Sequence, residues 1–356
     1  MKLFSCTNCN YPVYFENIFC IHCNASLGFD AVSLQPVAII SENNGLYSTI
    51  KRKDKTLYKY CNNYQYGVCN WLIPADDASG FCIACSLNRT IPDLSRTEYM
   101  ERWKAIEIAK HRLVYQLLRM KLPVVPKQQD EQIGLVFDFK ANELNNKKER
   151  ILTGHDNGVI TLNIEEADDV EREMARRQMD EVYRTLLGHF RHEVGHYYWD
   201  RLIDNTSNLE KFRNLFGDDT IDYNEALQKH YKEGAPLNWN EHYISMYATT
   251  HPWEDWAETW AHYLHIIDTL ETAYSFGLSI NPIIAASQKM HTEIKKDPYA
   301  IKDFNTIFQM WIPLTFAMNS LNRSMGLKDI YPFVISEPVK QKMKFIHEVV
   351  LNALAA

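Results

Sequence analysis

The sequence predicts an α+β protein in which a cysteine-rich N-terminal region precedes a mainly helical domain with a small β-sheet. Three observations support this fold class. All eight cysteines lie before residue 86, β-prone runs gather between residues 134 and 164, and residues 95–120, 165–203 and 270–356 have mostly helical patterns. The 356 residues, 46% of them hydrophobic and 23% charged, suit a folded chain of two or three domains.

The first four cysteines form two Cys-x-x-Cys pairs with ten residues between the pairs. Each pair fits a tight turn whose backbone amides point at the sulfurs, and two such turns make a tetrahedral zinc site. We therefore expect a structural zinc site at Cys6, Cys9, Cys20 and Cys23, with His22 as a bystander. Because a segment this short cannot build a sufficient core, zinc would supply its folding free energy.

The other four cysteines are spaced less regularly, since seven residues separate the first two. We expect a second structural zinc site at Cys61, Cys69, Cys82 and Cys85. The alternatives are free thiols in a core, or a different division of the eight cysteines between the two sites. Four thiolates leave no open coordination position, so neither site is expected to be catalytic. Residues 1–90 are thus expected to form a zinc-ribbon region.

The remaining chain alternates between helical and strand patterns. Residues 95–120 predict a helix, within a linker at 91–130, whose apolar stripe is Tyr99, Trp103, Ile106, Leu113, Leu117 and Met120. Residues 134–139 predict a strand, and Asn157 and Gly158 predict a hairpin turn between the runs 151–153 and 159–164. Residues 165–203 predict one long helical stretch. Residues 270–356 predict mostly helix, ending in an amphipathic helix at 339–354, so the last domain would span 131–356.

The strongest motif lies at residues 192–196, which read His-Glu-Val-Gly-His and match H-E-x-x-H. Residues four apart share one face of a helix, so His192 and His196 can point two imidazoles at one metal ion. Glu193 lies at the edge of that face, where a carboxylate can take a proton from zinc-bound water during attack on a carbonyl. Gly195 is costly inside a helix but lets another segment approach closely. The alternative is a helix whose two histidines only pack or face solvent.

A third protein ligand is needed, and the segment around residues 250–258 supplies the best candidates. Pro252 is typical of a helix start, which places Glu254 in the first turn and Glu258 one turn later on the same face. This arrangement lets Glu254 bind zinc while Glu258 fixes the tautomer of a ligand histidine. Asp255 lies about 100° further around the helix and is the alternative ligand.

The pairing of H-E-V-G-H with E-D-W-A-E resembles the gluzincin metallopeptidases, whose third ligand is a Glu. More closely, Y-R-T-L-L-G-H-F-R-H-E-V-G-H-Y-Y-W-D and Y-A-T-T-H-P-W-E-D-W-A-E-T-W-A-H-Y-L resemble a bacterial family of zinc-binding metallopeptidases with an N-terminal zinc-ribbon region. The resemblance covers most of the chain and implies a gluzincin-like domain.

The resemblance implies His192, His196 and Glu254 as ligands and Glu193 as general base. In lethal-factor-like gluzincins a Tyr seven residues before the ligand Glu assists the oxyanion. Tyr247 stands there, although an aromatic at this place is also ordinary core.

The leading hypothesis is a zinc-dependent peptidase with three zinc ions per chain, one catalytic and two structural. One alternative is an amidase or deamidase that acts on a non-peptide amide. The other is an interaction protein whose zinc ribbons bind a partner and whose helical metal site is inactive; an intact Glu193 argues against it. We expect a peptide or protein as substrate and a protein partner as the possible ligand of the ribbons.

Charge and hydropathy argue against other classes. A formal net charge of −7 does not favour nucleic-acid binding, which needs a basic footprint. No apolar run has membrane-spanning length, and the N-terminus lacks the apolar stretch of a secretory signal. We therefore expect a cytoplasmic protein, in which clustered cysteines favour metal over disulfides.

Overall fold

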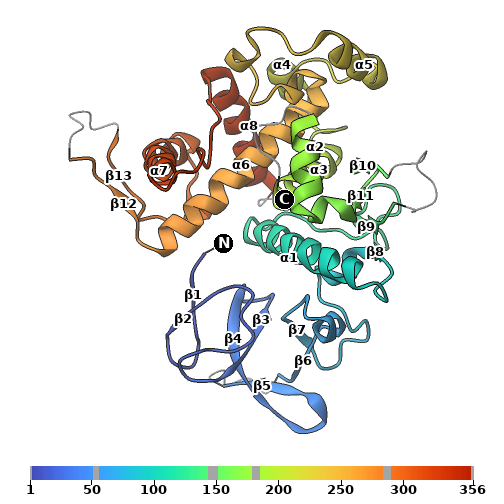
Figure 1. The fold of residues 1–356 in the computed structure, drawn as a ribbon, viewed down its shortest axis with the longest axis vertical. Coiled ribbons are helices and arrows are strands. Elements are labelled where there is room, and N and C mark those ends of the chain that lie inside the picture. Colours follow the sequence, from blue (N-terminus) through green and yellow to red (C-terminus); the bar gives the residue numbers. More distant parts are fainter. Residues whose placement is uncertain (1, 51–55, 143–150, 179–184, 284–289, 354–356) are drawn as a thin grey trace. The chain divides into compact units, whose positions relative to one another are not determined.

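The chain forms two compact units, Met1–Glu173 and Met174–Ala356, in a computed structural model. The model describes residues 2–50, 56–142, 151–178, 185–283 and 290–353. The first unit combines two clusters of four cysteines with β-sheets, and the second is mainly helical (Figure 1). The α+β class predicted from the sequence is therefore confirmed, whereas the boundaries at residues 90 and 130 stay predictions.

A small closed barrel follows the first cysteine segment and extends into the second, and the sequence patterns above did not predict it. Its five strands are β3 (Ser26–Asp30), β4 (Gln35–Ser41), β5 (Tyr47–Thr49), β6 (Tyr58–Tyr60) and β7 (Trp71–Pro74). Val37, Ile39, Tyr58 and Leu72 form a buried core cluster inside this sheet. Before the barrel, β1 (Phe4–Ser5) pairs antiparallel with β2 (Pro12–Val13) within the first cysteine segment. Strands this short carry too few residues for a clear alternating pattern.

The rest of the first unit contains helix α1 (Thr97–Arg119) and a four-stranded sheet. The sheet has the order β10-β11-β9-β8, formed by β8 (Asn88–Thr90), β9 (Val136–Lys140), β10 (Gly154–Asp156) and β11 (Val159–Asn163). Asn157 and Gly158 have φ of 47° and 81°, the left-handed conformations of the hairpin turn predicted there. The predicted apolar stripe of α1 is buried throughout.

Two long helices, α3 (Leu186–Leu202) and α6 (Pro252–Ser275), cross at the centre of the second unit (Figure 1). They approach at Gly195, where an added Cβ would lie 3.0 Å from the Cα of Ala257. Trp256 donates from Nε1 to the Gly195 carbonyl oxygen at 2.8 Å. The expectation that Gly195 permits a close approach is confirmed.

The prediction of one helix over residues 165–203 is wrong. A short 3-10 helix, η4 (Ile164–Ala167), precedes α2 (Asp169–Gln178), and α3 begins afresh after Thr185. The backbone of Thr185 is extended, and its hydroxyl accepts a hydrogen bond from the Gly188 amide at 3.0 Å. This helix cap is a local signal that the apolar and charge patterns did not contain. Residues 179–184 lie outside the described residues.

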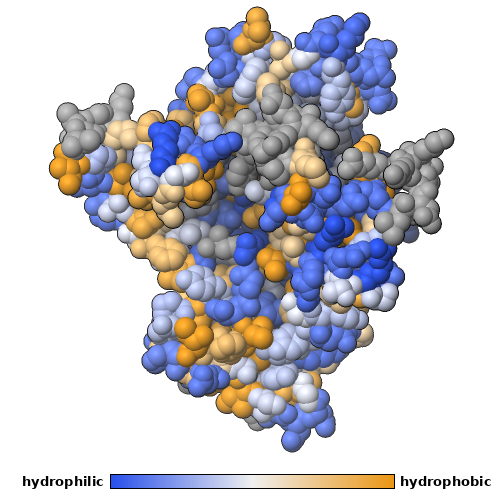
Figure 2. All heavy atoms as spheres, in the orientation of Figure 1, coloured by the Kyte–Doolittle hydropathy of each residue, from blue (hydrophilic) through white to orange (hydrophobic). Residues whose placement is uncertain are grey.

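The second unit is completed by α4 (Leu209–Phe216), α5 (Tyr223–Glu233), α7 (Phe304–Ser324) and α8 (Glu337–Ala353). Helix α8 packs on α6, and it contains the amphipathic helix predicted near the C-terminus. Helix α5 has no buried residue, and Figure 2 shows hydrophilic side chains gathered over this part of the surface. Within the described residues, no helix is both long enough and apolar enough to cross a membrane.

Candidate metal centres

Helix α3 places the two motif histidines one turn apart, with His192 Nε2 and His196 Nε2 separated by 3.2 Å. Glu254 Oε2 lies 3.0 Å from His192 Nε2 and 3.4 Å from His196 Nε2. Tetrahedral bonds of about 2.0–2.1 Å to one zinc ion would place neighbouring ligand atoms about 3.3 Å apart. The three atoms therefore have the mutual spacing of ligands around one zinc ion.

The start of helix α6 holds Glu254 in this position. His251 is the N-cap and accepts at Nδ1 from the Trp253 amide at 3.1 Å, and Pro252 occupies the first turn. Glu254 Oε2 is buried and receives no hydrogen bond of good geometry from the described residues. A buried carboxylate oxygen without such a donor needs a positive partner, and this donor set fits a zinc ion.

Glu258 lies one helical turn beyond Glu254 and contacts the far side of the first histidine. Its Oε1 is 2.7 Å from His192 Nδ1, and its Oε2 accepts from the Ser245 hydroxyl at 2.6 Å. Burial is the largest single effect and raises the pKa of Glu258, but the hydrogen bond to His192 and the charge of His192, with smaller effects of His262 and Ser245, together lower the pKa to about 2. Burial likewise opposes charge on His192, whose contacts with Glu254 and Glu258 still hold its pKa well above the ordinary value. A carboxylate on Nδ1 leaves Nε2 directed at the shared centre.

Tyr223 is a contact of the site that the sequence patterns did not reveal. Its hydroxyl donates to Glu254 Oε1 at 2.7 Å, so the two oxygens of this carboxylate have different surroundings. Burial raises the pKa of the Tyr223 phenol above its ordinary value, and the neighbouring Glu254 adds to this effect. Tyr223 begins a polar surface helix 31 residues before Glu254, and neither its spacing nor its neighbours form a motif.

Tyr247 lies on η6 (Tyr247–Thr249), close to the same group. Its ring centroid is 6.0 Å from that of His192, and its hydroxyl lies close enough to Tyr223 for the two phenols to affect each other's pKa. Burial raises the pKa of Tyr247 well above its ordinary value, with a further contribution from the Glu254 carboxylate. Because the Tyr223 hydroxyl donates its proton to Glu254, only the lone pairs of the Tyr223 oxygen remain available to the neighbouring Tyr247.

The two other acids named from the sequence occupy different places. Glu193 is buried, and its charge acts on both Tyr223 and Tyr247. Asp255 points away from the histidines and accepts from Lys342 Nζ at 2.5 Å. Complete burial raises the pKa of Asp255 to about 7, although Lys342 opposes this shift. Asp255 is therefore absent from the histidine–glutamate group.

The eight cysteines form the two groups of four expected from their spacing. The sulfurs of Cys6 and Cys23 lie 3.8 Å apart, and those of Cys69 and Cys82 lie 3.7 Å apart. Bonds of about 2.3 Å to one zinc ion would give about 3.8 Å between neighbouring sulfurs. The groups differ in burial. All four cysteines of the second group are buried, whereas Cys9 and Cys23 of the first group are partly exposed.

Comparison with known proteins places these sites in a family. Residues 99–349 match the family described as "Putative zinc-binding metallo-peptidase", and residues 3–96 match a zinc-ribbon domain. Uncharacterized proteins of Mycobacterium tuberculosis and Mycobacterium bovis are 43% identical over 351 residues, which cover 98% of this chain and 95% of theirs. No solved structure matches. The chain thus belongs to the putative zinc-binding metallo-peptidase family, with a zinc-ribbon domain preceding the family region.

Proposed function

We propose that the protein is a zinc-dependent peptidase that hydrolyses peptide bonds at the group formed by His192, His196 and Glu254. The single observation that carries this proposal is the spacing of the two imidazole nitrogens and Glu254 Oε2, which lie 3.0–3.4 Å apart. Three protein ligands would leave one tetrahedral position for water or substrate, as catalytic zinc sites require. Three zinc ions per chain follow, one at this group and one at each cysteine group.

A zinc ion held by these residues would supply Lewis acidity to the scissile carbonyl and to the attacking water. Glu193 takes the proton of that water and passes it to the leaving amine. Glu258 orients His192, and Tyr223 holds Glu254 through its other oxygen. Tyr247 donates a hydrogen bond to the developing oxyanion once substrate displaces its contact with Tyr223.

Two other functions use the same residues differently. An amidase or deamidase would apply the same chemistry to a non-peptide amide. An interaction protein would use its zinc ribbons to bind a protein partner and keep the helical metal site inactive. Tyr14 and Phe19 are exposed near the first cysteine group in the sequence. Exposed aromatic side chains are common in protein interfaces, so they support a protein contact there whether or not the helical metal site is active.

Replacing Glu193 by Gln tests the reaction. We expect peptide cleavage to fall at least about 100-fold while the zinc content stays unchanged, because the variant loses the proton acceptor and keeps the ligands. Glu210→Gln, an exposed acid on α4, is the matched control and should leave cleavage unchanged. Cleavage is followed by mass spectrometry on a peptide library, which also identifies the bond that is hydrolysed. Equal cleavage by wild type and Glu193→Gln would refute the proposed mechanism.

Metal analysis gives the second test. The wild-type protein should contain three zinc ions, and replacement of both His192 and His196 by Ala should leave two. A wild-type value of two, unchanged by the double replacement, would show that the helical group does not hold zinc. Activity on small amides without peptide cleavage would favour the amidase.

A further inference from the structure

Helix α1 contributes a histidine to the second cysteine group. His111 Nε2 lies 3.5 Å from the sulfur of Cys85 and 3.9 Å from the sulfur of Cys82. His111 lies beyond residues 3–96, which match the zinc-ribbon domain, and within residues 99–349, which match the metallo-peptidase family. The second cysteine group therefore contacts a side chain from the other region of the chain, within one compact unit.

The contact of His111 Nδ1 with a backbone carbonyl fixes the tautomer of the imidazole. Nδ1 lies 2.7 Å from the backbone carbonyl oxygen of Glu107, one turn earlier on α1. A carbonyl oxygen only accepts, so Nδ1 carries the proton and, in the neutral ring, Nε2 presents its lone pair to the sulfurs. A backbone carbonyl on Nδ1 with Nε2 directed at a metal is the usual arrangement of a ligand histidine.

The distances from Nε2 to the two sulfurs match those between zinc ligands. A nitrogen bonded at about 2.0–2.1 Å and a sulfur bonded at about 2.3 Å to one zinc ion would lie about 3.6 Å apart. His111 is 3% exposed, Cys82 2% and Cys85 3%, so solvent does not separate the three side chains. A positive centre nearby stabilises a lone pair that faces thiolates in a buried site, and a zinc ion held by the cysteines provides one.

The surrounding contacts hold α1 in this position. Lys110 Nζ lies 2.8 Å from Glu107 Oε1, which also accepts from Asn88 Nδ2 at 2.8 Å. Lys110 donates to Asn88 as well. Asn88 begins strand β8, three residues after Cys85, so this buried network joins the cysteine group, the sheet and the helix. The His111 ring therefore has little freedom to turn away from the sulfurs.

We propose that His111 is a fifth donor of the second cysteine site and takes a position on zinc when the thiolate of Cys85 or Cys82 dissociates. The site then keeps four protein ligands, three sulfurs and one nitrogen, which is a common set for structural zinc. This role is separate from peptide hydrolysis, because it concerns how firmly zinc is held in the first unit.

The first cysteine group provides the control, because the histidine in its second turn is engaged elsewhere. The ring of His22 stacks on Tyr11, with centroids 5.0 Å apart and an interplanar angle of 6°. Loss of one cysteine there should leave zinc with three protein ligands. Cys20→Ser is thus the matched control for Cys85→Ser, since both replace a buried cysteine of a four-cysteine group.

The experiment compares zinc per chain in the full-length protein after dialysis. Cys85→Ser should contain as much zinc as wild type, whereas Cys85→Ser combined with His111→Ala should contain one zinc ion fewer, as should Cys20→Ser. Cobalt(II) replacement of zinc reports the donor set, because loss of a thiolate weakens the sulfur-to-cobalt absorption. The comparison counts differences from wild type, so it does not depend on whether the helical group binds zinc or cleaves peptides.

A second measurement keeps all eight cysteines. Zinc release to a chromogenic chelator proceeds by stepwise loss of ligands, so His111→Ala should accelerate release from the second group about tenfold. His22→Ala should not change release from either group.

Zinc loss from Cys85→Ser equal to that from Cys20→Ser would overturn the proposal. So would an unchanged release rate in His111→Ala, which would limit His111 to a hydrogen bond with the thiolates. If Cys85→Ser does not fold, Cys82→Ser replaces it.

Discussion

At the scale of single residues, the two oxygens of Glu254 explain much of the site. Oε2 faces both histidines, while Oε1 accepts from the Tyr223 hydroxyl. A carboxylate held in this way presents one oxygen to a metal ion and leaves space for water or substrate. The hydrogen bond from Tyr223 therefore fixes the orientation of the Glu254 carboxylate, although no contact joins Tyr223 to His192 or His196 among the described hydrogen bonds.

Replacing Tyr223 by Phe tests this role. The variant removes the hydroxyl and keeps the ring, so Glu254 loses one hydrogen bond while the packing against His251 remains. We expect zinc affinity at the helical group to fall about 10- to 100-fold, as is typical when an outer partner of a metal ligand is lost. Tyr231→Phe, an exposed tyrosine on the same helix, should leave the affinity unchanged.

Zinc affinity in these variants is measured by competition with a chelator, in protein whose cysteine groups keep their zinc. This readout does not require peptide cleavage. Equal zinc affinity in Tyr223→Phe and wild type would show that the hydrogen bond to Glu254 does not support the metal site.

Some residues of the site can be predicted from the sequence and others cannot. The spacing of His192 and His196 predicts that they share one face of a helix, one turn apart, and the same holds for Glu254 and Glu258. Tyr223 and His111 are brought to their sites by tertiary packing, from elements that have no local motif. No spacing pattern in the sequence links Tyr223 or His111 to the ligands that they contact, so these contacts could not be predicted.

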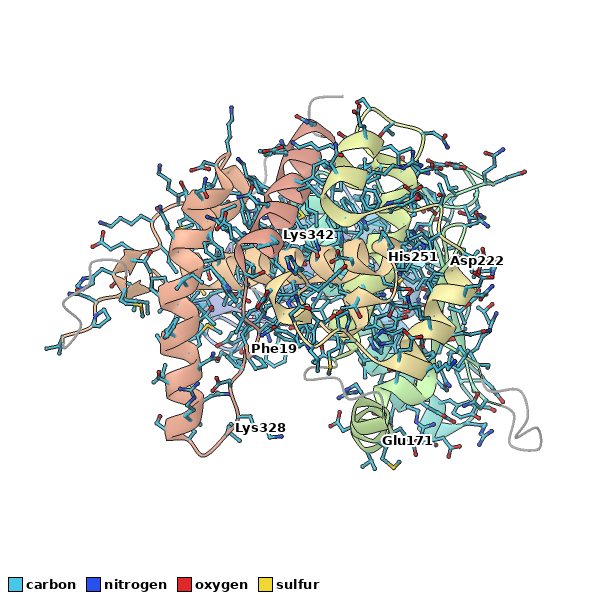
Figure 3. The ribbon with its side chains drawn as sticks, turned by 90° about the horizontal axis from the view of Figure 1, so that it is seen from above. Phe19, Glu171, Asp222, His251, Lys328 and Lys342 are labelled. Atoms are coloured by element: carbon cyan, nitrogen blue, oxygen red, sulfur yellow. The ribbon has the colours of Figure 1, made fainter. Side chains whose placement is uncertain are left out.

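At the scale of elements, the first turn of α6 is fixed from several sides. His251 caps the helix and donates from Nε2 to the Ile221 carbonyl oxygen at 3.0 Å, and Figure 3 shows His251 near Asp222. Asp255 is bound by Lys342 of α8, which also donates to the His242 carbonyl oxygen at 2.8 Å. Asp255, the alternative ligand predicted from the sequence, thus anchors the turn that carries Glu254.

Replacing Lys342 by Met should destabilise the second unit by about 3–5 kcal/mol, because it leaves the buried Asp255 without its cation. Combining Lys342→Met with Asp255→Asn should restore a large part of this loss, since no unpaired charge remains. Lys211→Met removes an exposed ion pair with Glu348 of the same helix α8 and should cost less than about 1 kcal/mol.

Urea denaturation measures these free energies of unfolding, with far-ultraviolet circular dichroism as the signal. A loss in Lys342→Met no larger than that in Lys211→Met would contradict the role assigned to the buried pair.

The sequence predicts helix α1 and the hairpin turn at Asn157 and Gly158, but neither the barrel nor the break before α3. The apolar stripe of α1 repeats over several turns and is buried as expected. The barrel strands β3–β7 have three to seven residues each, and their closure depends on pairing between distant segments. The break at Thr185 depends on one side chain that caps α3, which a pattern of charges and apolar residues does not show.

At the scale of the whole molecule, three groups suited to zinc differ in ligands and exposure. The helical group offers three protein ligands, while each cysteine group offers four. Cys9 and Cys23 are partly exposed in the first cysteine group, and all members of the second are buried. A chelator must reach the metal before it can remove it, so the three groups should release zinc in a fixed order.

We expect the helical group to release zinc first, the first cysteine group next and the second cysteine group last, with at least about a tenfold difference in rate between the cysteine groups. Peptide cleavage should disappear with the first ion. Timed alkylation with mass spectrometry identifies the thiols freed at each stage, and Cys9 and Cys23 should react before Cys61 and Cys85. Early alkylation of Cys61 or Cys85 would mean that burial does not protect the second group. In that case the helix α1 contacts would contribute little to holding its zinc.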